Sequence, residues 1–446
     1  MSRDASLVGD ELNQVALEAY LYFYPMVLME HTRRNGTNVT RDAKSGRAPM
    51  GVINHVREYP ALDFKAVVRP NFDTLYSSAW IDVSREPWLF HIPAMKDRFF
   101  MLPFYDMWTD VFASPGTRTH GEGALTLALC DPEWRGSLPE GVERIDAPTK
   151  TVWTIGRTET RGVDDYEAVR ALQDQMWLRP LSSWQSDEFA LDDTVIPAWK
   201  TKLPPMVQTD TMEAAEFFAL ASELVAVQPP HASDWGQVAR LARAGFHVGH
   251  RFVLANQDDD VQAAFREAPA AARKAIGRRF GNLIPFVNGW STILETMGTW
   301  GNSYLRRAMM AMFGLGANPP EESIYPNALT DSAGQPLDGH AHYSVHFAAD
   351  ALPPVRAFWS LTVYDQKGFP VPNEINRAAL GDRDELVYNS DGSLTMYVGP
   401  SLRDEWPLEN WIPTPPENFA MTLRLYLPED SVLTGRWTPP TTTKLA

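Results

Sequence analysis

The chain has 446 residues, of which 44% are hydrophobic and 22% are charged. Its length is roughly three times that of an average domain, so two or three hydrophobic cores are expected, and the formal net charge of −16 argues against nucleic acid as a partner. The single cysteine, Cys130, excludes an intrachain disulfide and every multi-thiolate metal or redox site.

The start of the sequence indicates a protein that does not enter a membrane. MSRDASLVGDELNQ lacks the apolar segment of a signal peptide, and the run AYLYFYPMVLM is much shorter than the roughly 20 residues that cross a bilayer. We therefore expect a soluble, cytoplasmic protein with no membrane partner. Across residues 10–34, apolar residues at helical spacing predict a helix with one apolar stripe, formed by Leu12, Val15, Ala16, Ala19 and Tyr20.

Strand signals dominate residues 69–160. Aromatic and β-branched runs such as EPWLFHIP, RFFMLPFYDMWTDVFAS and TVWTIGRT are separated by glycine and proline, which predicts a β-domain. From about residue 210 to 312 the period becomes helical. Asp210 and Glu213 resemble a capping box, a new helix is expected near Ser233 or Asp234 after a double proline, and further helices are expected across 261–280 and 284–312.

The last part of the chain returns to strands. Residues 358–364 alternate in character, which predicts a strand, and Asp391-Gly392 is typical of a hairpin turn between two strands. In MTLRLYLP, residues 421–428, apolar and polar residues also alternate, so we expect a strand that is buried on one side only.

Several blocks of the sequence occur in the order found in a known pair of families. They are VVRPNFDTLYSSAWIDVS, YDMWTDVFASPGTRTHG, YLRRAMMAMFGLGANPPEESIYP, AFWSLTVYDQKGFPVPNEINRAALGD and NWIPTPPENFAMTLRLYLP. With these blocks the chain resembles the paired families 1254 and 1214 of domains of unknown function. Asp110 departs from the resemblance, because members typically have asparagine there, and so do His340 and His342, because members usually have no histidine pair at that place.

The resemblance implies an α+β fold with two β-sandwich, jelly-roll-like domains and a helical segment between them. The expected organisation is an N-terminal helical segment (1–40), a family 1254-like sandwich (41–205), a helical middle (206–320) and a family 1214-like sandwich (321–446). Paired sandwiches leave sheet edges and faces that a symmetric partner often covers, so a homo-oligomer is expected. The resemblance implies no particular reaction.

The stretch RPNFDTLYSSAWID, residues 69–82, has both a structural and a functional interpretation. Structurally, Asn71 or Asp73 forms an Asx-turn that fixes the entry into the following strand. Functionally, Arg69 lowers the pKa of the nearby Asp73 carboxyl, and Tyr76 points a hydrogen-bond donor at a ligand. The two interpretations are compatible.

In FYDMWTDVF, residues Asp106, Trp108 and Asp110 would share one face of a strand. The Cα atoms of Asp106 and Asp110 would then be roughly 13 Å apart, too far for one directly shared proton, although a twist or bulge would shorten this distance. If either met Asp73 across the sheet, like charge would raise one pKa and place a general acid beside a general base. The alternative is a solvated strand face. Arg118 could neutralise such a group or bind an acidic substrate.

Metal and nucleotide motifs are scarce. His340 and His342 could bind a divalent metal with a third ligand from elsewhere, although such a pair is more often exposed polarity, and His346 lies roughly 20 Å from His340 on an extended strand. HExxH is absent, and no P-loop or complete dinucleotide fingerprint occurs. No cofactor is therefore predicted, and a divalent metal only as a minor alternative.

The remaining candidates for ligand binding are aromatic or lie near turns. Trp300 and Tyr304 could form a stacking platform, although core packing is the commoner role for such residues. Tyr364, Asn376 and Arg377 occupy a turn-rich segment from which polar side chains can reach a cleft.

Two hypotheses about function follow. The first is an enzyme of hydrolase or lyase type that acts on a small neutral molecule bound between the domains. Asp73 would be the base and Asp106 the acid, while Tyr76 and Arg118 would stabilise developing negative charge. The second is a protein that binds carbohydrate or another small ligand without catalysis.

Overall fold

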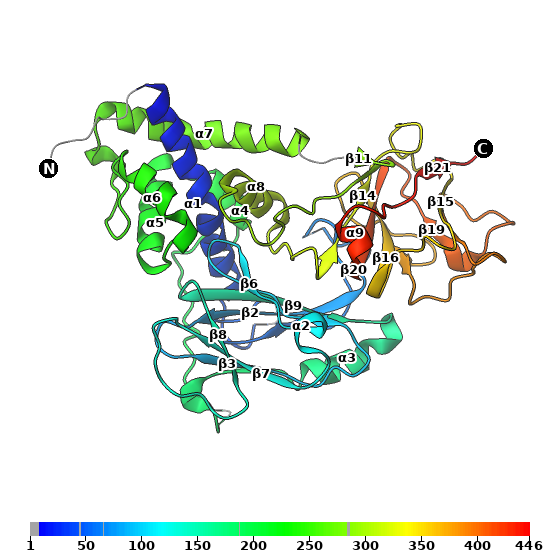
Figure 1. Ribbon diagram of the computed structural model, residues 1–446, viewed down its shortest axis with the longest axis horizontal. Coiled ribbons are helices and arrows are strands. Elements are labelled where there is room, and N and C mark those ends of the chain that lie inside the picture. The colour runs from blue at the N-terminus through cyan, green and yellow to red at the C-terminus, as the bar shows by residue number, and fades with distance from the viewer. Residues whose placement is uncertain (1–8, 44–45, 66, 187, 283–285) are drawn as a thin grey trace.

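The computed structural model describes residues 9–43, 46–65, 67–186, 188–282 and 286–446. The first residues of the predicted N-terminal segment and positions 284–285 of the last predicted helix therefore lie outside the described residues. The fold mixes helices with several largely antiparallel sheets (Figure 1). Within the described ranges, no helix is both long enough and apolar enough to cross a membrane.

The first half of the chain forms two sheets. One has the strand order β1-β2-β9-β5-β6, with β4 also paired to β9; the other has the order β10-β3-β7-β8, in which only β7 and β8 are parallel. Apolar side chains from both sheets, such as Ile81, Phe90 and Val152, form one cluster. The strands are β1 (Asn54–His55), β2 (Thr74–Asp82), β3 (Trp88–Ile92), β4 (Phe100–Met101), β5 (Phe104–Tyr105), β6 (Val111–Ala113), β7 (Leu125–Cys130), β8 (Glu143–Asp146), β9 (Thr151–Glu159) and β10 (Trp177–Pro180).

The C-terminal part also contains two sheets. One has the order β11-β12-β14-β20-β16-β17, with β13 paired to β20; the other has the order β19-β18-β15-β21. A second apolar cluster draws on both, for example on Val345 and Leu423. The strands are β11 (Phe286–Val287), β12 (Trp290–Ser291), β13 (Ser323–Ile324), β14 (Asn327–Ala328), β15 (Tyr343–Phe347), β16 (Val355–Asp365), β17 (Ala379–Gly381), β18 (Leu394–Gly399), β19 (Trp411–Pro413), β20 (Phe419–Pro428) and β21 (Thr442–Lys444).

Helices α4 to α8 pack around the first helix, α1, and this group lies above the N-terminal sheets in the view of Figure 1. Up to Ala19 this helix buries one stripe as predicted, but from Tyr20 to His31 every residue is buried because α4, α5, α7 and α8 surround it, so a single stripe is too narrow a description. The helices are α1 (Asp10–Thr37), α2 (Thr117–His120), α3 (Tyr166–Gln173), α4 (Pro205–Asp210), α5 (Ala214–Val227), α6 (Trp235–Ala242), α7 (Asp259–Asn282), α8 (Tyr304–Gly314) and α9 (Asp430–Leu433).

Four local predictions need correction. Asp210 ends α4 rather than capping α5, which begins at Ala214 without a side-chain cap. The helix expected across 284–312 is confined to α8, because β11 and β12 occupy part of that segment. Strand β20 is buried on both faces rather than one, because its polar residues pack against the first half of the chain. The Asp391-Gly392 turn forms, but only the run after it, β18, is a strand.

Candidate functional site

A tight turn between β5 and β6 carries the two neighbouring carboxylates at positions 106 and 110. The backbone N–H of Asp106 donates to the carbonyl of Asp110 (3.0 Å), and Thr109 has a positive φ of 72°. The Oδ1 atom of Asp106 accepts the backbone N–H groups of Trp108 (2.9 Å) and Asp110 (3.0 Å). The predicted shared strand face is therefore wrong: the chain reverses here, and the turn brings together two carboxylates that an extended strand would separate.

His231 completes this group of charges. It follows the double proline after α5, and its Nε2 atom donates to the Oδ2 atom of Asp106 at 2.5 Å. Asp106 is fully buried, whereas 19% of the His231 side chain and 14% of the Asp110 side chain are exposed. The ligand atoms of the three residues all lie within 4.8 Å of one another. The buried Asp106 thus binds His231 and the backbone of Asp110, whose side chains both reach solvent.

Behind this group lies a buried arginine bound to two acids. Arg307, from α8, is fully buried and places Nη2 3.3 Å from Asp110 Oδ2 and Nη1 3.7 Å from Asp234 Oδ2. Asp234 also accepts the hydroxyls of Tyr304 (3.0 Å) and Tyr22 (3.1 Å). The acid–base cluster is the name used below for Asp106, Asp110, His231, Asp234, Tyr304 and Arg307.

Two buried tryptophans hold the segments that carry the acid–base cluster in place. The Nε1 atom of Trp108 donates to the carbonyl of Pro229 (2.8 Å), which anchors the segment that carries His231. Trp300 donates its backbone N–H to Asp110 Oδ1 (2.7 Å) and its Nε1 to the carbonyl of Thr109 (3.0 Å). Both rings are buried, so they position the carboxylates instead of forming an open stacking platform.

Two members of the acid–base cluster, Asp110 and His231, have raised pKa values. Burial raises the pKa of Asp110 to about 6; Arg307 opposes this shift and the Asp106 charge adds to it. Burial alone would lower the pKa of His231, but the hydrogen bond to Asp106 and the charges of Asp106 and Asp110 outweigh it, so the pKa is raised. Two groups with shifted pKa values, with ligand atoms within 4.8 Å of each other, can exchange protons with a bound molecule.

The same residues offer a donor set for a metal ion. Two carboxylates and an imidazole are ligands that zinc and other divalent metals accept. However, the Arg307 guanidinium already lies against Asp110 and would repel a cation there. Proton transfer therefore suits the cluster better than metal binding. His340 and His342 do not meet: His340 is exposed beside Asp338, and His342 lies 3.1 Å from the carbonyl of Ser401.

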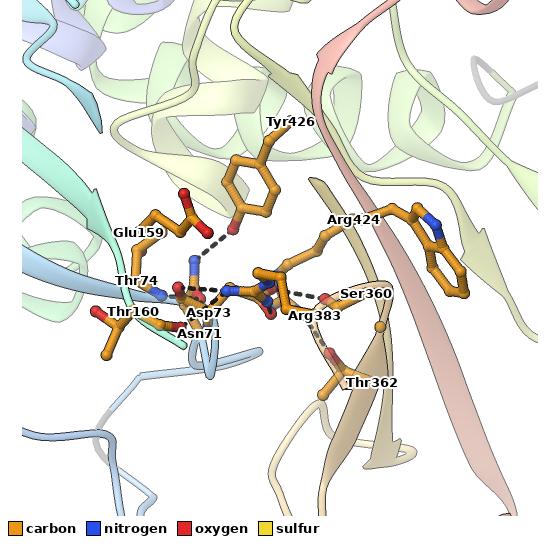
Figure 2. Close-up of polar contacts among 12 residues, drawn as sticks. Asn71, Asp73, Thr74, Glu159, Thr160, Ser360, Thr362, Arg383, Arg424 and Tyr426 are labelled. Carbon is orange, nitrogen blue, oxygen red and sulfur yellow. Dashed lines mark hydrogen bonds and ion pairs between the residues drawn. The ribbon is translucent and has the colours of Figure 1, made fainter. Parts of the chain in front are cut away.

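Asp73 belongs to a different set of contacts (Figure 2). It is 1% exposed and pairs with the Nη2 atom of Arg383, and its Oδ2 atom accepts the hydroxyl of Ser360 at 2.6 Å. Asn71 forms the predicted Asx-turn, because its Oδ1 atom accepts the backbone N–H of Asp73 (2.6 Å), while its Nδ2 donates to Tyr426 (2.8 Å). These residues join the first half of the chain to the C-terminal sheet.

The arginines around Asp73 differ from the predicted arrangement. Arg69 does not pair with Asp73; its Nη1 atom donates to Asn327 and to Thr422 (2.7 Å). Tyr364 donates to the carbonyl of Pro70 at 2.5 Å and is buried. Asp73 and Asp106 share no contact partner, so the predicted base–acid pair of these two residues does not form.

Four predicted residues lie in neither group. Tyr76 lies beside Arg157, whose guanidinium carbon is 5.2 Å from the centre of the Tyr76 ring, and Arg118 pairs with the buried Glu322 (2.8 Å). Asn376 is exposed in a turn, and Arg377 donates to the carbonyls of residues 408 and 411.

Sequence reasoning thus found Asp106, Trp108, Asp110, Trp300 and Tyr304 of this region and missed His231, Asp234 and Arg307. The double proline before His231 was a usable signal, because it fixes the backbone where that histidine leaves the helices. Nothing in the local pattern of α8 singles out Arg307 as buried.

Comparisons with known proteins place these residues in context. Residues 50–180 match a family model described as "Protein of unknown function (DUF1254)", and residues 322–430 match "Protein of unknown function (DUF1214)". Asp106 and Asp110 fall in the first match, whereas His231, Asp234, Tyr304 and Arg307 fall between the two. The two matches together cover slightly more than half of the chain. A comparison with curated proteins found no match.

Two solved structures were compared with this chain. The VPA0106 protein from Vibrio parahaemolyticus is 20% identical, with a TM-score of 0.73 over 98% of this chain and 100% of that chain. An uncharacterized protein from Burkholderia cenocepacia is 12% identical, with a TM-score of 0.44 over 98% of this chain and 94% of that chain. At such identities the first likeness indicates a common fold and no more, and the second carries no argument.

Proposed function

Because this chain belongs to the paired DUF1254 and DUF1214 families, whose descriptions name no function, we propose its function from the acid–base cluster. The protein is an enzyme of hydrolase or lyase type that acts on a small neutral molecule by general acid–base catalysis. The observation that carries this proposal is the 2.5 Å contact of His231 with the buried Asp106, beside Asp110, whose pKa is raised to about 6.

Each group has a role that follows from its contacts. Asp106 accepts the Nε2–H of His231, which leaves the Nδ1 lone pair to take a proton from the substrate or from water. Asp110, with a pKa of about 6, carries a proton in part of the population near neutral pH and can return it to a leaving group. Asp106 orients the imidazole and stabilises its charged form. This replaces the expected pairing of Asp73 with Asp106.

An activity screen with matched variants tests the proposal. Wild-type protein is assayed against small neutral esters, amides and β-hydroxy carbonyl compounds. For any substrate that turns over, His231→Gln lowers kcat by roughly 10²–10⁴-fold, the usual contribution of a general base, and leaves the circular dichroism spectrum unchanged. His340→Gln is the control, because the His340 side chain is exposed and pairs with the surface residue Asp338; it keeps wild-type activity.

The screen also separates the enzyme from the expected alternative. Full turnover by a folded His231→Gln protein would remove His231 from the chemistry. A protein that binds a carbohydrate saturably, turns over none of the compounds and keeps its affinity in His231→Gln is instead a binding protein.

We also propose the finer architecture expected from the sequence. Each pair of sheets is a jelly-roll-like β-sandwich, which is supported by the apolar clusters that draw on both sheets of a pair. The protein is cytoplasmic and forms a homo-oligomer. Size-exclusion chromatography with light scattering tests the last point, and a mass equal to one chain contradicts it.

A further inference from the structure

Arg157 is a buried cation that no acid of the described residues balances. It lies in β9 opposite Tyr76, and only 8% of its surface is exposed. Its Nη1 atom donates to Asn318 Oδ1 (2.9 Å) and to the carbonyl of Ile155 (3.2 Å), whereas its Nε atom is buried with no hydrogen-bond partner. Among the described residues, no carboxylate forms an ion pair with it. Buried charges in proteins are normally paired, so this one calls for an explanation.

The other buried arginines show the usual solutions. Arg307 faces Asp110 and Asp234, and Arg383 faces Asp73. Arg424 has no acid within ion-pair distance in the described part of the chain, but it donates to Thr362, to Tyr364 and to two backbone carbonyls, so its N–H groups are used. Arg157 has neither solution.

Phenols and an amide surround the guanidinium instead. Its carbon atom lies 5.2 Å from the centre of the Tyr76 ring, and Asn318 ties the site to its neighbours by accepting the hydroxyl of Tyr105 (3.0 Å) and donating to Tyr325 (3.2 Å). Burial alone would lower the pKa of Arg157, but these phenols outweigh it and the pKa is raised, so the side chain stays charged.

The side chain of Arg157 points away from the core of the first two sheets. Successive side chains of a strand point to opposite faces, so Arg157 and Tyr76 point away from the face that carries Gly156 and Ser77. A void of about 10 Å³ is lined by Arg157 together with Ser77, Gly156 and Leu102. It has room for one water molecule and is too small for a carboxylate. Tyr76 and Tyr325 are each partly exposed, so solvent reaches the phenols beside the buried guanidinium.

We infer that Arg157, with the hydroxyls of Tyr76 and Tyr325, binds one small carboxylate monoanion between the first sheet and β13. A guanidinium presents parallel N–H groups that match the two oxygens of a carboxylate, and phenols add donors without charge. One cation balances one negative charge. Arg424, which also lies near the Tyr325 ring, is committed to its own acceptors, so a dianion such as phosphate would remain half unbalanced. The site does not use the acid–base cluster, so it stands or falls independently of the proposed catalysis.

Thermal unfolding with added anions tests the site. Sodium acetate raises the Tm of the wild-type protein along a saturable curve, because a ligand that binds only the folded state stabilises it by mass action. Sodium chloride at the same ionic strength gives a smaller, unsaturated change. Arg157→Met abolishes the acetate effect. Arg144→Met is the matched control, because Arg144 is an exposed arginine paired with Asp146; it responds as wild type.

Two further measurements keep the inference testable if Arg157→Met does not fold. Arg157→Lys retains the positive charge but lacks the paired N–H groups of the guanidinium, and its apparent Kd for acetate rises at least tenfold. The NMR signal of ¹³C-labelled acetate broadens with wild-type protein and sharpens again when Tyr76→Phe removes one donor. No saturable acetate effect in the wild type, or an unchanged effect in Arg157→Met or Arg157→Lys, overturns the inference. Equal saturation by chloride also overturns it, because it indicates an adventitious ion only.

Discussion

Replacing Asp73 by asparagine keeps the shape of the side chain and removes its charge. In the folded protein this carboxylate is buried, pairs with Arg383 and accepts the Ser360 hydroxyl. Arg383 is itself largely buried and also donates to the carbonyls of Asp73 (3.1 Å) and Thr160 (2.9 Å). The substitution therefore leaves the guanidinium in place, held by neutral oxygens alone.

The expected loss of stability follows from that arrangement. Removing one partner of a buried ion pair costs about 3–5 kcal/mol, because the other charge stays buried without compensation. Asp174→Asn is the matched control, since Asp174 pairs with Arg57 at the surface with 63% of its side chain exposed. Such exposed pairs contribute roughly 0–1 kcal/mol.

Urea unfolding, followed by tryptophan fluorescence and circular dichroism, measures both variants under one set of conditions. Asp73→Asn shifts the midpoint strongly to lower urea at an unchanged slope, and Asp174→Asn hardly shifts it. A loss below about 1 kcal/mol in Asp73→Asn would refute the reasoning, because it would mean that Arg383 needs no counter-charge.

Two further predictions concern the acid–base cluster. The pKa of Asp110 is raised to about 6 in the folded protein, so the stability that its protonation contributes is complete below about pH 4 and is lost as the pH rises through about 6. Asp110→Asn removes on the order of 1–3 kcal/mol of this pH dependence in unfolding measured from pH 4 to 8, and an unchanged pH dependence contradicts the assignment. Asp106→Asn lowers the pKa of His231, because the carboxylate charge that raises this pKa is gone. The pKa is measured by titrating the imidazole NMR signal of His231, which is assigned by its absence in His231→Gln. An unchanged titration midpoint in Asp106→Asn contradicts the contact between the two residues.

The local sequence pattern predicted several helices and strands correctly. Alternation located β16, and helical spacing located α1, α5 and α7. It misjudged β20 because Thr422 and Arg424 resemble a solvated face, yet these side chains are buried against residues of the first half. A polar residue satisfied by a distant partner looks the same in sequence as one satisfied by water. The expected domain boundaries remain predictions.

In the candidate site, too, residues close in sequence could be predicted together and residues distant in sequence could not. Asp106 and Asp110 were identified together, but the turn that joins them depends on a backbone reversal that the strand-like sequence FYDMWTDVF conceals. His231 lies 125 positions from Asp106, and no spacing rule connects them. The same limitation affected Asp73, whose counter-charge is Arg383 rather than the nearby Arg69.

The bond between Asp73 and Arg383 spans 310 positions of the chain, which matters while the protein is being made. At roughly 5–20 residues per second, a ribosome needs roughly 15–60 s to advance from the first of these residues to the second. During that interval the first two sheets can fold, but the aspartate at their border still faces water. The contact between the first half of the chain and the C-terminal sheet therefore forms late in synthesis, after the residues of both parts have been made.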